Sequence, residues 1–249
     1  MKAMILIPTY NEAISVVELL HGLETLRNTK EFDFDVTVID DNSPDGTADI
    51  VQKLELDWVS ILRRPKKDGL GNAYRAGFAT VLKDLRYDQI VTMDADGSHR
   101  IADLPAMFNA ISPGKSIVLG TRWIPGGSVV NWPKSRQLLS KSGTRYASLA
   151  LGIDLADLTG GFRIYSRPLL EALNLTEMDA TGYCFQIEMA LASHIAGATA
   201  TEVPITFVER INGVSKMSRA IVIEALIQTT RWGFTRRLQP NADKLHYVK

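Results

Sequence analysis

Short apolar runs alternate with segments of helical spacing along the first half of the chain. The apolar runs lack the polar alternation of a strand that is exposed on one face, so each reads as a strand buried on both faces. The helical segments repeat apolar residues every three or four positions, as Val16, Leu19 and Leu23 do. Strands are expected at 4–7, 36–39, 58–62, 89–93 and 116–119, and helices at 13–26, 70–83 and 101–111. This order predicts an α/β fold with a mostly parallel sheet flanked by helices.

The second half of the chain is less regular. A stretch rich in glycine, proline and tryptophan at 120–133 leads into an expected helix at 135–151. Further on we expect a helix at 186–194, a strand at 201–208 and a final helix at 219–232. No repeat or long linker demands a second independent domain. We therefore predict one large domain over 1–217, followed by a C-terminal amphipathic helix and tail over 218–249.

The composition narrows the class of protein. The chain has 249 residues with 28 Lys+Arg and 28 Asp+Glu, and this zero net charge argues against a nucleic-acid-binding protein. The single cysteine, Cys184, excludes an intrachain disulfide and predicts a reducing, cytoplasmic setting. The first apolar run is broken at Pro8, which is too early for a signal peptide, and nowhere are there the roughly 18 apolar residues of a membrane span.

Three polar motifs follow expected strands: PTYNE, DDNSPDGT and DADGSH. Ligands of open parallel sheets bind beyond the carboxyl ends of the strands, so these motifs are expected to line one edge. In the second motif Pro44 and Gly46 supply a turn, and Thr47 is expected to cap the following helix. Of Asp40 and Asp41, one can order the turn while the other accepts hydrogen bonds from a ribose or base. An Asx-turn with a cap is the alternative.

Asp94 and Asp96 are separated by one residue and point the same way if the chain stays extended. Two neighbouring carboxylates repel unless one is protonated or a cation lies between them. Oxygen ligands of this kind suit Mg²⁺ or Mn²⁺ shared with substrate phosphates. The chain has no Walker A or GxGxxG loop, and Pro105 stands where an EF-hand needs its glutamate. The alternative is that Asp96 and Ser98 only cap the next helix.

Basic residues in the second half are candidates for binding phosphate, because arginine can bind it through two nitrogens and lysine supplies a point charge. They are Arg122, Arg136, Arg163, Arg210 and Lys216. Ordinary solvated surface residues are the alternative.

The final helix places Arg219, Arg231, Arg236 and Arg237 around apolar and aromatic residues. This is the pattern of a helix that lies on an anionic membrane, and a helix packed on the domain with a charged end is the alternative.

Seven motifs in this order and spacing resemble the polyprenyl/dolichyl-phosphate mannose synthases, which are inverting family 2 glycosyltransferases with a GT-A fold. They are PTYNE, DDNSPDGT, DADGSH, GTR, TGGFRIYSR, GYCFQIEM and VPITFVERINGVSKMS. The resemblance extends from Ile5 to about Ser218, and it implies that the large domain is the catalytic one. The tail after Arg237 matches no part of the family pattern.

The resemblance implies roles for individual residues. The nucleoside of GDP would contact Pro8, Tyr10, Glu12, Ile39 and Asp41. The diphosphate and a Mg²⁺ or Mn²⁺ ion would be held by Asp94, Ala95 and Asp96, with Ser98 near the cation. Arg122 and Arg136 would face the sugar diphosphate or the lipid phosphate. Arg210 and Lys216 belong to the segment that resembles the acceptor loop. Of these, Asp96, Arg122, Arg136 and Lys216 are the catalytic candidates.

The implied reaction is transfer of mannose from GDP-mannose to a polyprenyl monophosphate, with inversion. The acceptor phosphate is already anionic, so no general base is required, and Glu188 is expected to be structural or to lie near the metal. The lipid acceptor implies a peripheral protein on the cytoplasmic face of a membrane. The final helix, a separate membrane-protein subunit, or both would provide the contact.

Three other functions remain open at this point. A relative that uses UDP-glucose or another UDP-sugar is the nearest alternative. A binding or scaffold protein would keep the fold without turnover. A metal-dependent nucleotidyltransferase would also use carboxylates at strand ends, but it leaves the acceptor-like loop and the basic final helix unexplained.

Overall fold

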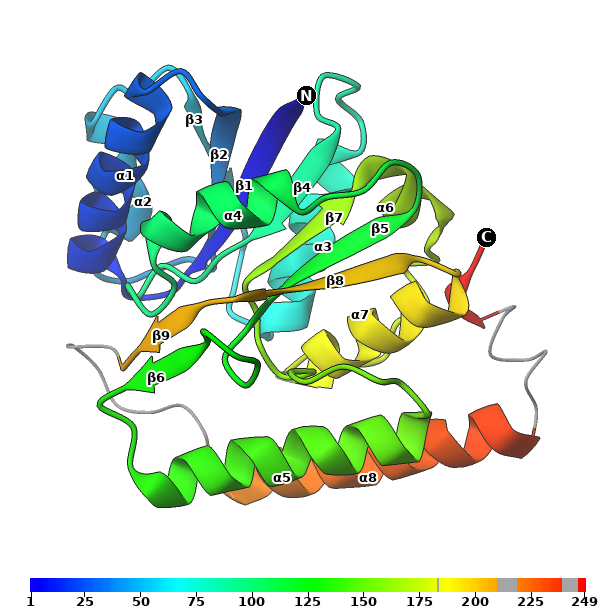
Figure 1. The fold of residues 1–249 in the computed structure, drawn as a ribbon. Helices are drawn as coiled ribbons and strands as arrows, with labels where there is room; N and C mark the ends of the chain where they lie inside the picture. Colours follow the sequence, from blue (N-terminus) through cyan, green and yellow to red (C-terminus); the bar gives the residue numbers. More distant parts are fainter. Residues whose placement is uncertain (183, 210–218, 239–245) are drawn as a thin grey trace.

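A seven-stranded sheet runs through the middle of the molecule in the order β3-β2-β1-β4-β7-β5-β8 (Figure 1). The computed structural model describes residues 1–182, 184–209, 219–238 and 246–249. The strands are β1 (Lys2–Thr9), β2 (Asp33–Asp40), β3 (Val59–Arg63), β4 (Gln89–Thr92), β5 (Ser116–Thr121), β7 (Arg163–Ser166) and β8 (Thr199–Pro204). All neighbouring pairs are parallel except those of β7, which runs antiparallel to β4 and β5.

Helices cover both faces of the sheet, as the apolar strands predicted. In β1, Ile5 and Ile7 pack with α1 (Ala13–Asn28), α2 (Thr47–Lys53) and α4 (Leu104–Asn109). Met4 and Leu6 point to the other face and pack with α3 (Leu70–Val81), α6 (Arg167–Ala172) and α7 (Cys184–Ile195). Alternate side chains of one strand thus enter two cores, which is why these runs show no polar alternation.

Several expected elements differ in detail from the structure. The strand expected at 201–208 is broken into β8 and β9 (Thr206–Val208), and β9 pairs with β6 (Ser128–Val130) in a separate two-stranded sheet. The helix expected at 101–111 is a 3₁₀ turn at Ile101–Asp103 followed by α4. The cap expected at Thr47 is wrong, because the N-cap is Gly46 and the Thr47 hydroxyl bonds to Asp45. The short elements β6, β7 and α6 lacked a clear pattern in the sequence.

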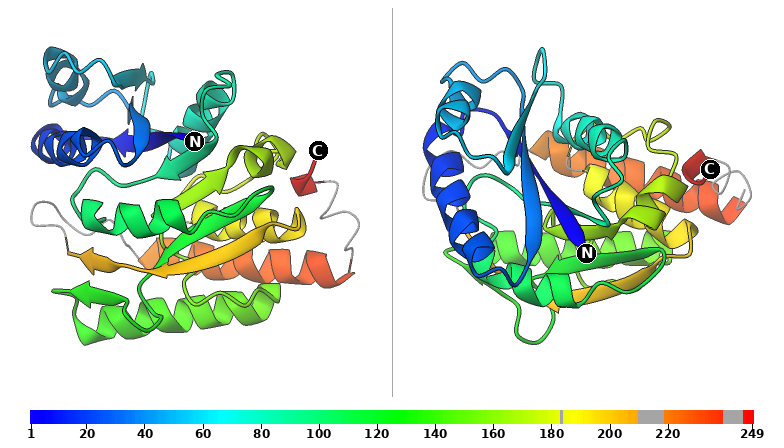
Figure 2. Two further views of the ribbon diagram at one scale, coloured as in Figure 1. Left: turned by 45° about the horizontal axis from the view of Figure 1, so that its top comes forward. Right: turned by 90° about the horizontal axis from the view of Figure 1, so that it is seen from above.

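Helices α5 (Lys134–Leu151) and α8 (Arg219–Leu238) lie side by side along one face of the molecule (Figures 1 and 2). They run parallel: the Tyr146 hydroxyl bonds to that of Thr230, and the Arg236 guanidinium donates to the Leu151 carbonyl. Gly233 allows this close approach, since a Cβ there would come within 2.5 Å of the Ala150 carbonyl oxygen. The final helix was predicted, but its pairing with α5 was not.

The last described residues pack beside α6. Tyr247 is buried, its carbonyl accepts from Asn174 N at 2.9 Å, and Lys249 N donates to the Ala172 carbonyl at 3.0 Å. The boundary predicted between 217 and 218 lies outside the described residues. Within the described part of the chain, no helix is both long enough and apolar enough to cross a bilayer.

Candidate active site

The ends of β1, β2 and β4 bring the three polar motifs together. These strands are neighbours in the sheet and run parallel, so their carboxyl ends lie at one edge. Asp41 N donates to the Thr9 carbonyl at 3.1 Å, and Met93 N donates to that of Leu6 at 3.1 Å. β5 points the same way, which places Arg122 at this edge, two strands from β4. The expected gathering of these motifs is therefore present.

Asp40 and Asp41 have different surroundings, and Asp40 has the turn-ordering role that the sequence predicted for one of them. Asp40 orders the turn, accepting from Thr9 Oγ1 at 3.0 Å and from Ser43 N at 2.9 Å. Asp41 is buried and pairs with Arg64, a residue to which the sequence assigned no role. Burial raises the pKa of Asp41 above its usual value, although the Arg64 guanidinium opposes the shift. A contact between Asp41 and a nucleoside stays a prediction.

The other residues predicted to bind the nucleoside differ in what they present at this edge. Pro8 is half-buried near the end of β1, opposite Ile39 in β2. The Ile39 side chain is fully buried beneath Gly77, so any contact with a ligand would come from its backbone. Lys67 Nζ lies 4.0 Å from the centre of the Tyr10 ring. Glu12 accepts from Ser15 Oγ at 2.8 Å, at the start of α1.

The segment after β4 carries the carboxylate pair. Met93 and Ala95 are buried while Asp94 and Asp96 are half-buried, the alternation expected if both carboxylates lie on one side. Asp96 Oδ1 accepts from Ser98 N at 3.1 Å, and Gly97 adopts a φ of +74° in the turn between them. The helix-cap alternative is wrong, because the next helical turn begins at Ile101 and has no side-chain cap.

These side chains fit a divalent cation that shares its ligands with a phosphate. Ser98 Oγ is buried and has no hydrogen-bond partner among the described residues, beside the two half-buried carboxylates. Buried polar atoms are normally paired, so this hydroxyl is available to a bound ligand. No group of three or more His, Cys, Asp or Glu side chains in the described part of the chain can enclose a metal. Protein carboxylates completed by water and phosphate oxygens are typical of Mg²⁺ and Mn²⁺ sites.

Arg122 is held by Asp157, a residue that the sequence analysis did not single out. Its Nε and Nη2 donate to the two Asp157 oxygens at 2.7 and 2.8 Å, and both side chains are buried. Burial raises the pKa of Asp157, but the Arg122 charge and the hydrogen bonds from Arg122 and Thr159 together outweigh burial and hold this pKa below its usual value. Phe207 and Trp132 also lie 5.4 and 5.3 Å from the guanidinium. Contact between Arg122 and a substrate stays a prediction.

Arg136 lies at the start of α5 and pairs with Glu209. Its guanidinium is 4.0 Å from the centre of the Trp132 ring. The ion pair with Glu209 connects α5 to the end of the described segment 184–209. Arg210 and Lys216, which the sequence assigned to the acceptor-like loop, lie outside the described residues.

Arg163 and Glu188 are buried structural residues. Arg163 donates to the carbonyls of Gly160, Leu158 and Gln186 at 2.9, 2.9 and 2.6 Å. Glu188 accepts from the backbone of Asp179 and Ala180 at 3.0 and 2.9 Å, so it holds that loop against α7. Burial raises the pKa of Glu188, and the two backbone hydrogen bonds oppose the shift. These contacts agree with the structural role expected for Glu188.

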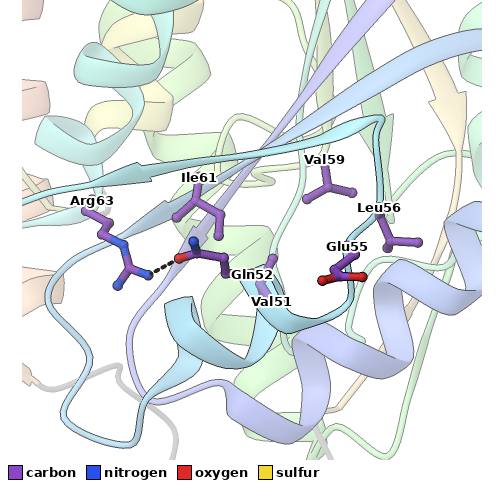
Figure 3. A pocket seen from close by; sticks show the side chains of 7 residues that line it. All are labelled: Val51, Gln52, Glu55, Leu56, Val59, Ile61 and Arg63. Atoms are coloured by element: carbon purple, nitrogen blue, oxygen red, sulfur yellow. Dashed lines mark hydrogen bonds between the residues drawn. The ribbon is translucent and has the colours of Figure 1, made fainter.

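A surface pocket of about 330 Å³ lies elsewhere, between α2 and β3 (Figure 3). It is lined by Val51, Gln52, Glu55, Leu56, Val59, Ile61 and Arg63. β3 is three strands away from β4, and the pocket contains none of the residues predicted to bind substrate. The carboxylate edge, and not this pocket, is therefore the candidate active site.

A model of the family described as "Glycosyl transferase family 2" matches residues 4–173, which include all three polar motifs and Arg122. The chain belongs to this glycosyltransferase family. It is therefore an enzyme, which decides against the scaffold protein and the nucleotidyltransferase. The matched region ends directly after α6, so α7, β8, β9 and α8 lie beyond it.

Two relatives of this glycosyltransferase are similar over nearly their whole length. An undecaprenyl-phosphate mannosyltransferase of Micrococcus luteus is 44% identical, over 95% of this chain and 96% of its own. A polyprenol monophosphomannose synthase of Mycolicibacterium smegmatis is 39% identical, over 95% of this chain and 89% of its own.

Solved glycosyltransferase structures share the fold. Mannosyl-3-phosphoglycerate synthase of Rubrobacter xylanophilus superimposes with a TM-score of 0.66 at 17% identity, covering 97% of this chain and 75% of its own. Glucosyl-3-phosphoglycerate synthase of Mycobacterium tuberculosis, crystallised with Mn²⁺ and UDP, gives 0.64 at 15% identity, covering 95% and 79%. These similarities confirm the predicted GT-A-like fold.

Proposed function

We propose that this glycosyltransferase transfers mannose from GDP-mannose to a polyprenyl monophosphate, with Mg²⁺ or Mn²⁺ at Asp94 and Asp96. The observation that carries the proposal is the pair of relatives named for this type of product, which are 44% and 39% identical across almost the whole chain. The carboxylate pair and the unpaired hydroxyl of Ser98 support the cation. The resemblance of SPDGT and ERINGVSKMS to the mannose synthases supports the donor.

The reaction requires little of the protein beyond placing charges. An oxygen of the acceptor phosphate attacks the anomeric carbon, the bond from that carbon to the GDP oxygen breaks, and the configuration inverts. A bound cation supplies neutralisation of the charge on the departing diphosphate. Asp94 and Asp96 hold that cation, and Arg122, fixed by Asp157, keeps a positive charge at the same edge. No proton has to be removed from the acceptor, so the site needs no general base.

A donor comparison tests this function. Purified protein is incubated with Mn²⁺ or Mg²⁺, a short-chain polyprenyl phosphate and, in parallel, GDP-mannose, UDP-glucose or UDP-GlcNAc. Lipid-linked mannose formed from GDP-mannose alone is the expected result. A product formed only from a UDP-sugar would overturn the proposed donor and favour the alternative.

We also propose that α5 and α8 together meet the membrane that holds the lipid acceptor. Most large apolar side chains left exposed in the described part of the chain lie on these two helices. They are Leu138, Leu139, Tyr146, Leu149, Ile223, Leu226, Ile227, Phe234 and Leu238. Thr144 and Ala147 of α5 and Thr229 and Trp232 of α8 are buried instead, so each helix presents an apolar stripe on its outer side.

The charge around this two-helix face favours an anionic lipid surface over a second copy of the chain. Exposed basic residues are Lys134, Lys141, Arg145, Arg231 and Arg237. α5 carries no acidic residue, and α8 carries only Glu224. Apolar side chains with flanking basic ones are typical of helices that lie in the plane of a membrane interface.

Vesicle flotation tests this membrane contact. Leu149→Ser and Phe234→Ser should each reduce binding to vesicles that contain anionic lipid. Ile14→Ser in α1 and Leu85→Ser in the turn before β4 are matched controls, because these residues are 70% and 80% exposed, compared with 68% for Leu149 and 61% for Phe234. Equal loss in all four variants, or binding only when a membrane-protein subunit is added, would contradict direct contact.

A further inference from the structure

The sequence assigned no role to His99, the last residue of the DADGSH motif. We propose that His99 is a positioning residue that fixes Asp94 for binding the metal and diphosphate, an inference that rests on the proposed function. Its Nδ1 accepts a hydrogen bond from the Asp94 backbone N–H at 3.0 Å. Its Nε2 lies 3.8 Å from Asp94 Oδ2. One imidazole therefore contacts both the main chain and the carboxylate of a single predicted metal ligand.

The imidazole is itself held in place by the core. His99 is 2% exposed and stacks on Phe162, with ring centres 4.9 Å apart and planes 11° from parallel. The Phe207 ring meets it edge-on, at 5.6 Å and 77°. These two contacts fix the plane of the imidazole ring. The placement of His99 against Asp94 is therefore set by Phe162, directly before β7, and by Phe207 in β9.

The hydrogen bond also fixes which ring nitrogen carries the proton. Nδ1 accepts from an amide, so in the neutral ring the proton is on Nε2, the nitrogen closer to the Asp94 carboxylate. A distance of 3.8 Å is too long for a hydrogen bond, so this N–H acts as an orienting dipole. Partners of this kind, which lie just behind a ligating group, orient it and tune metal affinity.

The same histidine connects the two halves of the candidate site. His99 forms a β-bridge with Phe207, and Val208 N donates to the Ser98 carbonyl at 3.1 Å. Phe207 in turn lies 5.3 Å from Trp132, ring centre to ring centre, and 5.4 Å from the Arg122 guanidinium. The segment with Asp94 and Asp96 and the segment with Arg122 are thus both packed against β9, through Phe207. His99 is the contact through which that packing reaches Asp94.

Three substitutions separate this role from simple packing. Asparagine places its amide oxygen near the position of Nδ1, and glutamine places its amide near Nε2, while leucine keeps neither. We expect His99→Gln and His99→Leu to weaken Mn²⁺ binding to the GDP-saturated protein by about tenfold or more, measured by calorimetry. His99→Asn should retain most of the affinity, and GDP binding without metal should be unchanged in all three. Wild-type Mn²⁺ affinity in all three, or equal loss in His99→Asn and His99→Gln, would overturn the proposal.

Two controls account for general effects. His21→Gln makes the same change on the exposed side of α1, and Tyr87→Phe removes a hydrogen bond to Asp35 of 2.7 Å far from Asp94. Both should keep the wild-type Mn²⁺ affinity. If Tyr87→Phe lost as much Mn²⁺ affinity as His99→Gln, the loss would come from general destabilisation of the fold, and the proposal would be overturned. If the wild-type protein binds Mn²⁺ with UDP in place of GDP, the proposed donor is wrong, and the same variants compared with UDP still decide the role of His99.

Discussion

Arg122 and Asp157 form a buried two-pronged ion pair, with 2.7 Å from Nε to Oδ2 and 2.8 Å from Nη2 to Oδ1. Arg122 directly follows β5, and Asp157 lies in the loop before β7. The ion pair therefore connects the end of β5 to the loop that leads into β7, the neighbouring antiparallel strand. Thr159 Oγ1 accepts from the same guanidinium at 2.8 Å. The charge that we propose for the reaction is therefore fixed before any substrate arrives.

Breaking this pair should destabilise the protein. Asp157→Asn leaves the Arg122 charge buried without its counterion, and we expect a loss of about 3–5 kcal/mol in the free energy of unfolding, measured in urea. Asp49→Asn breaks the exposed Arg63–Asp49 pair and should cost less than about 1 kcal/mol. Similar losses in both variants would show that burial of the Arg122–Asp157 pair does not matter.

Neutralising the carboxylate pair should remove activity and keep the fold. Asp96→Asn keeps the oxygen that accepts from Ser98 N but loses the charge. We expect mannosyl transfer to fall at least about 100-fold, because a bound cation provides several kcal/mol of charge stabilisation. The melting temperature should not decrease, since repulsion from Asp94 is relieved. Glu55→Gln, in the distant pocket, is the charge control. Near-normal transfer by Asp96→Asn would disprove the metal site.

The buried Glu188 should make stability depend on pH. Its pKa in the folded protein is raised above the ordinary value of 4.5, so between these two values the folded state binds more protons than the unfolded state. Stability must then fall as pH rises through this window, by at most about 1.4 kcal/mol per pH unit for one group. Urea unfolding of Glu188→Gln should show a shallower decrease than the wild type. A steeper decrease would reverse the assigned shift.

The close contact of α5 and α8 can be tested through two glycines. A Cβ at Gly233 would meet the Ala150 carbonyl, so Gly233→Ala should push the helices apart and lower the free energy of unfolding by about 1–3 kcal/mol. Gly143, within α5, has no atom within 4 Å of its added Cβ. Gly143→Ala should therefore stabilise the protein by up to about 1 kcal/mol, because alanine is the better helix former. Thermal and urea unfolding give both values, and stabilisation by both changes would contradict the tight packing.

The strands and helices of the first half could be predicted because their patterns are local. The apolar run Ile5–Ile7 and the spacing of Val16, Leu19 and Leu23 show which side chains are buried. This pattern does not depend on which other element covers them. The broken strand at β8 and β9 could not be predicted, because Ile205 between them remains apolar and only the pairing of β9 with β6 separates the two. The reversed direction of β7 likewise depends on partners distant in the sequence.

Residue types and their order along the chain were enough to determine the α/β class and the three polar strand ends, and to predict Asp94 and Asp96 as the metal ligands. They did so because strand ends and carboxylate spacing are properties of short segments. Only the tertiary structure decided that Asp157 holds Arg122, that His99 holds Asp94 and that α5 shares its outer face with α8. The Arg122–Asp157 pair and the α5–α8 contact join elements that are distant in the sequence, and no local pattern encodes which elements will meet. The contact between His99 and Asp94 depends on how the His99 ring is buried against Phe162 and Phe207.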